Sequence, residues 1–405
     1  MLHNFTKKYF TIGQSVVNGI TKTTLVPLWD KILEIPEFKK LQECEQNPKW
    51  HREGNAFNHT KNVVEFTIKY LDSSFFSNTL EYYEICVIGA LFHDIGKSVT
   101  TFEKDGVWHS YGHEIEGEKI TRRILWDEGY YFREKICALV RYHMDPLNIY
   151  NSKMPIEKCV ELSNQMISVG SCFNTLLQIK RFDILGSVQE NIDGEKNDLE
   201  KILNLFKFNT DIADMLNLIK KIKEHNTKPK ANVVMLIGLP GSGKDTFIKE
   251  KLIQEDSPFT YVTSFEGVLK TTPTYTNENS IVLCRDDIRT ELGFCKEGEK
   301  IVGTSEQENK VSDVFNQKLL KAAEEGKTII INNINLKKKY RKDIINRLQK
   351  FNVNVTYIYV EAKNLQLNID RRNGQISENV FNTMIENFDW PEFNEYNEIY
   401  FWKNG

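Results

Sequence analysis

Side chains that could hold divalent metals gather in the first half of this sequence. Of the eight histidines, six lie between His51 and His143. Among them His93 is followed directly by Asp94, in the stretch LFHDIGK. Imidazole and carboxylate ligands together suit divalent transition metals, and one carboxylate can bridge two ions. This clustering predicts a metal site in the N-terminal half of the chain.

Four further side chains complete the predicted site, and they are His59, His113, His143 and Asp183. A divalent ion held there would activate water near neutral pH and neutralise the charge of a phosphate. Lys97 ends the same LFHDIGK stretch and could hold a substrate phosphate as a point charge. His109 has no place in this pattern, so we expect it on the surface.

A glycine-rich stretch in the second half has the residues of a phosphate-binding loop. GLPGSGKDT follows an apolar run that is rich in β-formers. Glycines let backbone N–H groups turn towards phosphates, and the following helix N-terminus adds positive potential. We expect ATP or another NTP to bind here with Mg²⁺, and Lys244 to reach the β- and γ-phosphates. The expected contacts are Gly238, Pro240, Gly241, Ser242, Gly243, Lys244, Asp245 and Thr246.

The stretch CRDDIR, from Cys284 to Arg289, follows a further strand candidate. In open α/β sheets ligands bind at the carboxyl ends of the strands. Asp286 is therefore placed to take a proton from an attacking hydroxyl. Arg289, one helical turn further on, could clamp an anionic group of the acceptor. An aspartate in this position could instead only cap a helix, but the upstream P-loop favours catalysis.

The elements that must position these residues change in type near the middle of the chain. The first half is mostly helical by its three- and four-residue apolar spacing, and the polar stretch Lys223–Asn232 indicates a linker. Strand candidates then alternate with helices, which predicts a parallel α/β sheet. The strand candidates are Val233–Leu239, Ser280–Cys284, Thr328–Ile334 and Val353–Val360, and the helices include Ser305–Glu325 and Lys337–Lys350.

These patterns divide the chain into four parts. We expect an N-terminal extension at 1–24, an all-α domain at 25–225, a linker at 226–232 and an α/β P-loop domain at 233–405. The net charge is −3, so the sequence lacks the basic excess of a protein that coats long duplexes. A local basic site for polynucleotide ends remains compatible with that charge.

Composition also bears on location and partners. The longest apolar runs fall far short of the ~20 residues that span a bilayer, so we expect no membrane partner. The N-terminus lacks the apolar core of a signal peptide. The seven cysteines form no C-x-x-C pair, which indicates reduced thiols and a cytoplasmic protein. The sequence leaves open a homo-oligomer.

The N-terminal pattern resembles the HD phosphohydrolase superfamily, whose motif reads H…HD…H…H…D. The resemblance implies an all-helical fold and hydrolysis of phosphomonoesters, phosphodiesters or nucleotides. It assigns His59, His93, Asp94 and Asp183 to a first ion and His113 and His143 to a second, with Mn, Ni, Co, Fe or Zn as candidate metals. The stretch WHREGNAFNHT resembles a segment of HD domains fused to nucleic-acid end enzymes, in which His51 and Glu53 could contact substrate.

The C-terminal half resembles the polynucleotide kinases, in which R-D-D-x-R follows a G-x-P-G-S-G-K loop. INNINL, Ile331–Leu336, resembles the family's strand ending in D-x-N-L. Ile369–Pro391 resembles its C-terminal lid, which implies that Arg371 and Arg372 stabilise the transferring γ-phosphoryl group. A basic run, Lys337 to Lys342, could be a polynucleotide track or a solvated helix face.

Two positions depart from the kinase pattern. Asp245 stands where a serine or threonine is usual, and Asn333 where a carboxylate is usual. We hypothesise that Asp245 supplies the negative charge near Mg²⁺ that Asn333 lacks.

Together the two halves resemble the bifunctional HD-Pnk end-healing enzymes. The resemblance implies NTP-dependent phosphorylation of 5′-OH ends of RNA or DNA and removal of 2′,3′-cyclic, 2′- or 3′-phosphates, with a polynucleotide ligase acting downstream. Three alternatives remain open. They are an HD nucleotidase joined to a nucleoside kinase, a regulatory protein in which nucleotide gates the HD domain, and a structural or RNA-binding protein with degenerate sites.

Overall fold

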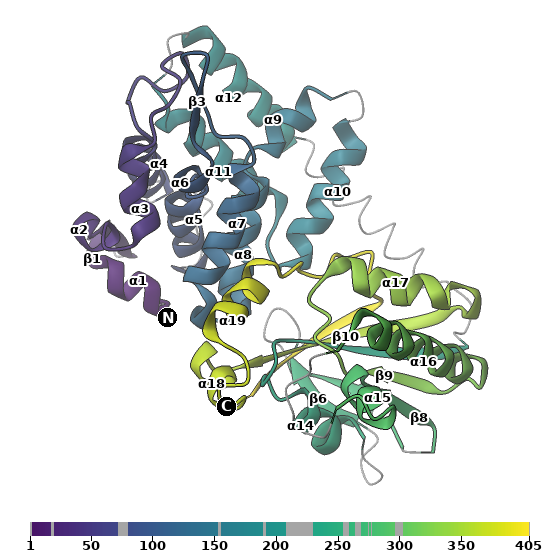
Figure 1. Ribbon diagram of the computed structural model, residues 1–405. Coiled ribbons are helices and arrows are strands. Elements are labelled where there is room, and N and C mark those ends of the chain that lie inside the picture. The colour runs from purple at the N-terminus through teal and green to yellow at the C-terminus, as the bar shows by residue number, and fades with distance from the viewer. Residues whose placement is uncertain are drawn as a thin grey trace. The chain divides into compact units, whose positions relative to one another are not determined.

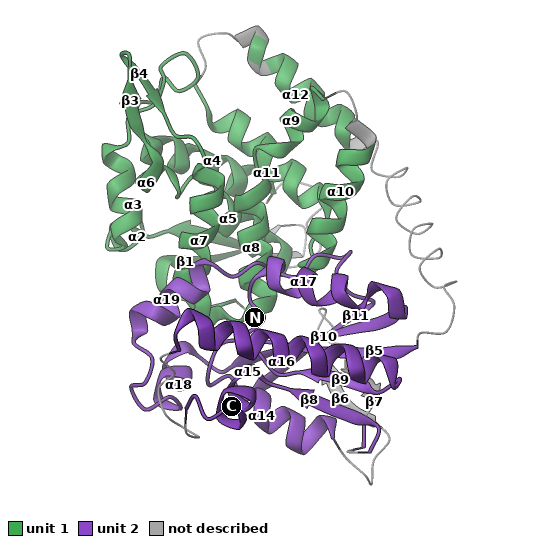
Figure 2. Cartoon of the chain, turned by 45° about the vertical axis from the view of Figure 1, so that its right-hand side comes forward, with its two compact units in different colours: residues 1–223 green, residues 224–405 purple. Residues whose placement is uncertain are grey.

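Two compact units make up the chain in the computed structural model, Met1–Lys223 and Glu224–Gly405 (Figure 2). The structure describes residues 2–17, 20–71, 80–152, 155–188, 192–207, 230–253, 259–263, 269–273, 275–276, 278–295 and 303–404. Most of the predicted linker 226–232 lies outside these residues. Ala231 and Asn232, at its end, belong to the first strand of the second unit.

Unit 1 is helical, with two short hairpins (Figure 1). Its hairpins are β1 (Phe10–Val17) with β2 (Ile20–Pro27), and β3 (Phe102–Lys104) with β4 (Val107–His109). Its α-helices are α1 (Asn4–Tyr9), α2 (Trp29–Ile32), α3 (Pro36–Lys40), α4 (Ala56–Leu71), α5 (Leu80–Phe92), α6 (Lys97–Thr100), α7 (His113–Ile124), α8 (Tyr130–Tyr142), α9 (Asp145–Tyr150), α10 (Pro155–Ser168), α11 (Phe173–Gly186) and α12 (Ile192–Lys207).

A buried ion network joins α7 to α8. Glu134 of α8 accepts hydrogen bonds from Nη2 of Arg122 at 3.0 Å and from Nε of Arg133 at 2.7 Å. All three side chains are almost fully buried, and a buried charge is tolerated when it is paired and hydrogen-bonded. The network therefore fixes the relative position of the two helices.

The first residues pack into unit 1. His3 donates from its backbone N–H to Glu84 at 2.8 Å, and its ring stacks on Phe132. Phe5 lies against Phe92, the last residue of α5. The segment that the sequence sets apart as an extension thus contributes core contacts to the helical unit.

Unit 2 is a seven-stranded sheet with helices. Five neighbouring strands run parallel in the order β11-β10-β5-β9-β8, and β6 and β7 extend the sheet as antiparallel strands beside β11. The strands are β5 (Ala231–Ile237), β6 (Phe259–Thr263), β7 (Leu269–Pro273), β8 (Ser280–Leu283), β9 (Thr328–Ile331), β10 (Val353–Ala362) and β11 (Glu398–Asn404).

The helices of unit 2 lie between these strands along the chain. They are α14 (Lys244–Phe247), which continues as a π-helical turn (Ile248–Leu252), and then α15 (Arg285–Glu291), α16 (Ser305–Glu324), α17 (Lys338–Leu348), α18 (Leu365–Asp370) and α19 (Glu378–Glu386). A capping box begins α16, because Thr304 accepts from the N–H of Gln307 while the Gln307 side chain accepts from the N–H of Thr304.

The core of unit 2 follows from the central strands. Every residue of β9 is buried, and β5 is buried along nearly its whole length. Such continuous apolar strands are typical of a parallel sheet that is covered on both faces. On one face, Val234 and Leu236 pack with Phe247 and Leu252 of the helix that follows the glycine-rich loop.

The predicted fold class, an all-α domain followed by an α/β domain with a parallel sheet, is confirmed. The sequence did not predict β6, β7 or β11. Among the described residues, no helix has the length and apolar character needed to cross a membrane.

Candidate active sites

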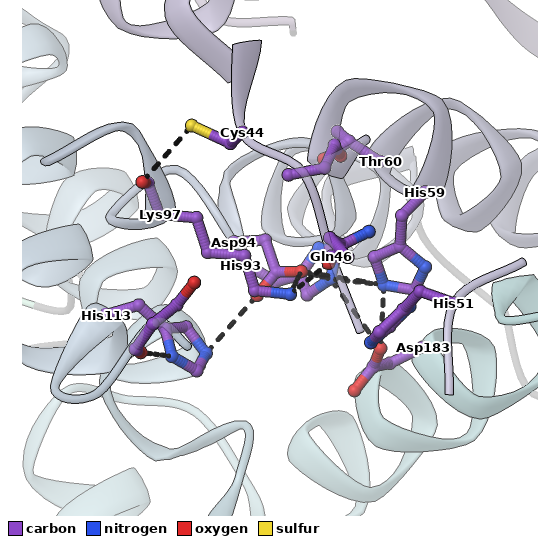
Figure 3. Close-up of polar contacts among 12 residues, drawn as sticks. Cys44, Gln46, His51, His59, Thr60, His93, Asp94, Lys97, His113 and Asp183 are labelled. Atoms are coloured by element: carbon purple, nitrogen blue, oxygen red, sulfur yellow. Dashed lines mark hydrogen bonds and ion pairs between the residues drawn. The ribbon is translucent and has the colours of Figure 1, made fainter. Parts of the chain in front are cut away.

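The six predicted metal ligands meet in unit 1, and Figure 3 labels five of them, His59, His93, Asp94, His113 and Asp183. α5 ends at Phe92, so His93 and Asp94 occupy the turn that follows it. α4 and α11 contribute His59 and Asp183. The other two are His113, the first residue of α7, and His143, the C-cap of α8.

Asp94 lies between two pairs of histidines. Its Oδ2 is 3.3 Å from Nε2 of His93 and 3.6 Å from Nε2 of His59. Its Oδ1 is 3.3 Å from Nε2 of His113 and 3.7 Å from Nε2 of His143. Each carboxylate oxygen thus faces its own pair of imidazoles. This is the arrangement expected of a carboxylate that bridges two ions.

Backbone carbonyls fix the tautomer of three of these histidines. His93, His113 and His143 each donate from Nδ1 to a carbonyl oxygen three residues earlier, at 2.8, 2.8 and 2.7 Å. A carbonyl can only accept, so Nδ1 carries the proton and Nε2 offers its lone pair. Histidines that bind metals are commonly oriented in this way.

The inward-facing nitrogens suit a cation. Nε2 of His113 and Nε2 of His143 lie 3.2 Å apart, and Nε2 of His59 and Nε2 of His93 are also 3.2 Å apart. The lone pairs of His113 and His143 would repel at this distance without a positive charge nearby. Oδ1 of Asp183 lies 3.0 Å from Nε2 of His59 and adds a negative charge. The donor set therefore fits divalent ions.

Glu53 lies behind His59 rather than in the ligand cluster. Its Oε1 accepts from Nδ1 of His59 at 2.9 Å and pairs with Nδ1 of His51 at 2.8 Å. Its Oε2 accepts from the N–H of Val188 at 2.9 Å. Burial alone would lower the pKa of His59, but the hydrogen bonds to Asp183 and Glu53 outweigh it and raise that pKa to about 9. These bonds allow Glu53 to orient His59, whereas the resemblance had suggested that Glu53 could contact substrate.

Two lysines neutralise the site's carboxylates. Nζ of Lys97 lies 2.6 Å from Oδ2 of Asp94 and also donates to Gln46 at 2.7 Å. Nζ of Lys180 lies 2.6 Å from Oδ2 of Asp183. Burial alone would raise the pKa of Asp94, but the nearby Lys97 and His93 outweigh it and hold that pKa well below its usual range. Both carboxylates are therefore ready as anionic ligands.

Sequence reasoning missed Lys180 and Gln46. Lys180 precedes Asp183 by three residues on a helix, a spacing at which side chains meet. Gln46 is far from Lys97 in sequence, and only the fold brings the two together.

Gly96 permits the close approach of α7 to the His-Asp turn. A Cβ at this position would lie 1.9 Å from the carbonyl oxygen of His113 and 2.5 Å from the N–H nitrogen of Gly117. Any side chain would push α7 away and separate His113 from Asp94. The glycine in LFHDIGK is thus explained by packing.

In unit 2 the glycine-rich loop follows β5, and α14 begins at Lys244. Gly243 has φ 98° in the left-handed region, and a Cβ there would lie 1.8 Å from Nδ2 of Asn404. Nζ of Lys244 donates to the carbonyls of Gly238 and Leu239, both at 2.9 Å. Burial lowers the pKa of Lys244 to about 8, against the opposing effect of Asp245.

Side chains from the C-terminal segments hold the loop's carbonyls. Asn368 donates to Pro240 at 2.9 Å, Arg371 to Gly241 at 3.1 Å and Asn404 to Ser242 at 3.2 Å. These three hydrogen bonds fix the backbone of the loop. Asn368 and Asn404 were not predicted, because they lie more than a hundred residues from the loop.

Two polar atoms near the loop fit an anionic ligand. Among the described side chains, Nε of Arg372 and Oγ of Ser242 are buried without a hydrogen-bond partner. Buried donors of this kind are costly unless a ligand or water satisfies them. Arg372 lines the same cavity as Lys244, so a nucleotide phosphate fits both observations.

Asp286 and Arg289 lie in α15, directly after β8. Nη1 of Arg289 is 2.5 Å from Oδ1 of Asp286. Glu308 of α16 accepts from Nε and Nη2 of Arg289, both at 2.8 Å, and from Nη2 of Arg285 at 3.0 Å. The bidentate pair fixes the plane of the Arg289 guanidinium. Glu308 was not predicted, since nothing in its local sequence marks it.

Asp245 and Asn333, the two positions that depart from the kinase pattern, each form a hydrogen bond. Nδ2 of Asn332 donates to Oδ1 of Asp245 at 2.5 Å. Oδ1 of Asn333 instead accepts from the N–H of Arg285 at 3.0 Å, at the start of α15. The hypothesis that Asp245 supplies the negative charge near Mg²⁺ that Asn333 lacks stays a prediction.

A cavity of about 1470 Å³ joins these parts in unit 2. Its lining includes Lys244, Asp286, Arg289, Arg371 and Arg372. The structure therefore brings the predicted phosphate loop, base and lid arginines to one space.

The basic side chains from Lys337 to Lys342, at the start of α17, have different roles. Arg341 is fully buried, pairs with Glu395 and donates to the carbonyls of Asn335 and Leu336. Lys338 pairs with Glu392. Lys339 and Lys342 are exposed. The run is therefore no continuous basic track, because one of its cations is structural and another is paired.

Comparison with protein families agrees with these two sites. Residues 56–173 match the family model of the HD domain, and residues 233–391 match that of an AAA domain. No curated protein matches the chain. The chain thus carries an HD domain followed by a P-loop kinase-like domain, which fits a bifunctional nucleotide-processing enzyme with phosphohydrolase and kinase activities.

Proposed function

We propose that this protein heals the ends of broken RNA or DNA. Its P-loop unit would phosphorylate 5′-OH ends with ATP or another NTP. Its HD unit would remove 2′,3′-cyclic, 2′- or 3′-phosphates from the opposite ends. A strand break that leaves a 5′-OH end and a 2′,3′-cyclic phosphate end needs both repairs. The two activities together would prepare such a break for a ligase.

In the kinase reaction, the loop N–H groups, Lys244 and the lid arginines would bind the NTP phosphates. The carboxylate of Asp286 would accept the proton of the attacking 5′-hydroxyl. Arg289, held by Glu308, would position an anionic group of the acceptor. Phosphoryl transfer depends mostly on positioning and charge stabilisation, and this lining can provide both.

In the HD unit, the six ligands would hold two divalent ions, which would supply Lewis-acid activation of water and neutralise phosphate charge. Lys97 would exchange its contact with Asp94 for a substrate phosphate oxygen. Lys180 would keep the charge of Asp183 balanced, and Glu53 would keep His59 in its orientation.

The observation that carries the proposal is the shared cavity of Lys244, Asp286 and Arg289, in the same chain as the Asp94 cluster. An anion-binding arginine beside the base suits an acceptor with a phosphate next to its hydroxyl, as in a polynucleotide.

The test is incubation of the protein with an RNA that carries a 5′-OH and a 2′,3′-cyclic phosphate, together with ATP and a panel of divalent metals. We expect a new 5′-phosphate and loss of the cyclic phosphate. An RNA that keeps both original ends under every metal would refute the proposal. Parallel reactions with nucleosides separate it from a small-molecule kinase.

A further inference from the structure

An exposed aromatic face lies beside the HD site, on the hairpin β3–β4. Phe102, His109 and Tyr111 form it. The His109 and Tyr111 rings stack with centroids 5.0 Å apart, and Phe102 lies 5.7 Å from His109 and 5.9 Å from Tyr111. Tyr111 is 72% exposed and Phe102 is 42% exposed.

The backbone explains why the three rings share one side. Phe102 pairs with His109 across the antiparallel hairpin, and directly opposite residues project from the same face. Tyr111 lies in the turn that follows β4, and its ring stacks on that of His109. The cluster is thus a consequence of register and not a chance proximity of mobile side chains.

This aromatic face is tied to the metal cluster at both ends. The hairpin begins after Lys97 and α6, and it ends just before His113. Oγ1 of Thr101 donates to the carbonyl of Lys97 at 2.8 Å, and Ser110 accepts from Nδ1 of His113 at 2.8 Å. Two residues of chain reach at most about 7 Å, so the backbone of Tyr111 lies close to that of His113.

Exposed aromatic side chains that gather in one patch are typical of interaction sites. We propose that this aromatic face stacks on unpaired bases next to the phosphate-bearing end of a polynucleotide, while that phosphate lies in the HD site. The inference rests on the proposed function and adds a substrate-binding surface to it.

A polynucleotide suits the face better than a free nucleotide. Small ligands are usually enclosed in a concave pocket, whereas the ring of Tyr111 is largely exposed to solvent. Aromatic platforms are a common means of holding single strands without sequence preference, because every base has a flat face. Three rings also offer area for more than one base.

The test compares two substrates of the full-length protein. One is a single-stranded RNA decamer with a 3′-phosphate, and the other is p-nitrophenyl phosphate, which has no base or strand. For Tyr111→Ala and Phe102→Ala we expect KM for the decamer to rise roughly 5- to 100-fold, as for loss of one base–aromatic stack. Turnover of p-nitrophenyl phosphate should stay within about twofold, since it reports only the metal site.

Two further variants serve as controls. Tyr111→Phe keeps the ring and should retain the wild-type KM. Val107→Ala removes an exposed aliphatic group from the same side of the hairpin without removing a ring, and it should also leave KM unchanged. The inference would be wrong if Val107→Ala raised KM for the decamer as much as Tyr111→Ala does. It would also be wrong if turnover of p-nitrophenyl phosphate fell as much as turnover of the decamer.

A binding assay separates this inference from the proposed function. Fluorescence anisotropy with a labelled decamer ending in 3′-OH requires no turnover, and Tyr111→Ala should weaken binding relative to wild type. A wild-type protein that binds the decamer but leaves a 2′,3′-cyclic, a 2′- and a 3′-phosphate all intact would refute the proposed function alone. Unchanged KM and unchanged binding in both alanine variants would refute the stacking face, and would favour a protein partner for these rings.

Discussion

The side-chain amide of Asn332 donates a hydrogen bond of 2.5 Å to the carboxylate of Asp245. Asp245 directly follows Lys244, so the contact joins the end of β9 to the phosphate-binding loop. We propose that this carboxylate, which stands where a hydroxyl is usual, helps to hold Mg²⁺.

Asp245→Asn should raise the Mg²⁺ concentration for half-maximal kinase activity by about tenfold or more, because it removes a negative charge next to the ion. Asn332→Ala keeps the charge and should shift that concentration by no more than about threefold, as expected for loss of one hydrogen bond. Mg²⁺ titrations of both variants at saturating ATP provide the measurement. Equal shifts would mean that the charge of Asp245 is not what Mg²⁺ requires.

Asp286→Asn should lower kinase kcat by about 10²- to 10⁴-fold, the usual contribution of a general base. The adjacent carboxylate offers a matched control, and Asp287→Asn should retain most of the activity. Phosphohydrolase activity of both variants should equal that of wild type. Comparable losses in the two variants would show that general negative charge in α15, and not a base at Asp286, supports the reaction.

Glu308→Gln should raise KM for the 5′-OH acceptor by about tenfold, because Arg289 loses its bidentate partner and becomes free to turn. KM for ATP should change little, since the Glu308 carboxylate accepts hydrogen bonds from Arg285 and Arg289 of α15, outside the phosphate loop. Steady-state kinetics with each substrate varied in turn will distinguish the two constants. A rise in KM for ATP without a rise in KM for the 5′-OH acceptor would contradict a role for Glu308 at the acceptor.

The affinity for ATP should fall as the pH rises above about 8. In the nucleotide-free protein burial lowers the pKa of Lys244 to about 8, so the ammonium is progressively lost above that pH. ATP phosphates favour the charged form, and binding must then take up a proton, which weakens affinity by up to tenfold per pH unit. Calorimetry at pH 8.5 in buffers of different ionisation enthalpy measures this uptake. Binding without proton uptake would show that Lys244 stays charged.

Glu53→Gln should weaken metal binding in the HD unit by about 10- to 100-fold, the range for loss of a partner that orients a histidine ligand. Titration with Mn²⁺ followed by calorimetry reports this directly, without turnover. Kinase activity serves as the check that the chain is folded. An unchanged Mn²⁺ affinity would leave Glu53 with only a packing role.

The parts that sequence could predict are those written in short, local patterns. The glycine-rich loop, the His93–Asp94 pair and the apolar strands can each be recognised from about ten consecutive residues. Glu308 and Asn332 could not be recognised, because their roles arise from contacts across tens of residues. The β6–β7 extension was missed for a similar reason, since strand order depends on tertiary pairing rather than local periodicity.

The aromatic face could not be predicted from the sequence, because it depends on which residues pair across the hairpin. His109 was expected on the surface because it fits no metal pattern, and it does lie outside the ligand cluster. Its significance depends on pairing with Phe102 and on the position of Tyr111 two residues later. Only the hairpin geometry turns these three residues into one surface.

The most direct test of the account follows both ends of one RNA in one reaction. An RNA with a 5′-OH and a 2′,3′-cyclic phosphate is incubated with ATP and divalent metal, and the end groups are read by mass spectrometry for wild type, Asp94→Ala and Asp286→Asn. We predict that wild type alters both ends, Asp94→Ala alters only the 5′ end, and Asp286→Asn alters only the cyclic phosphate. Wild-type protein that leaves both ends unchanged, or Asp286→Asn that still adds a 5′-phosphate, would contradict the account.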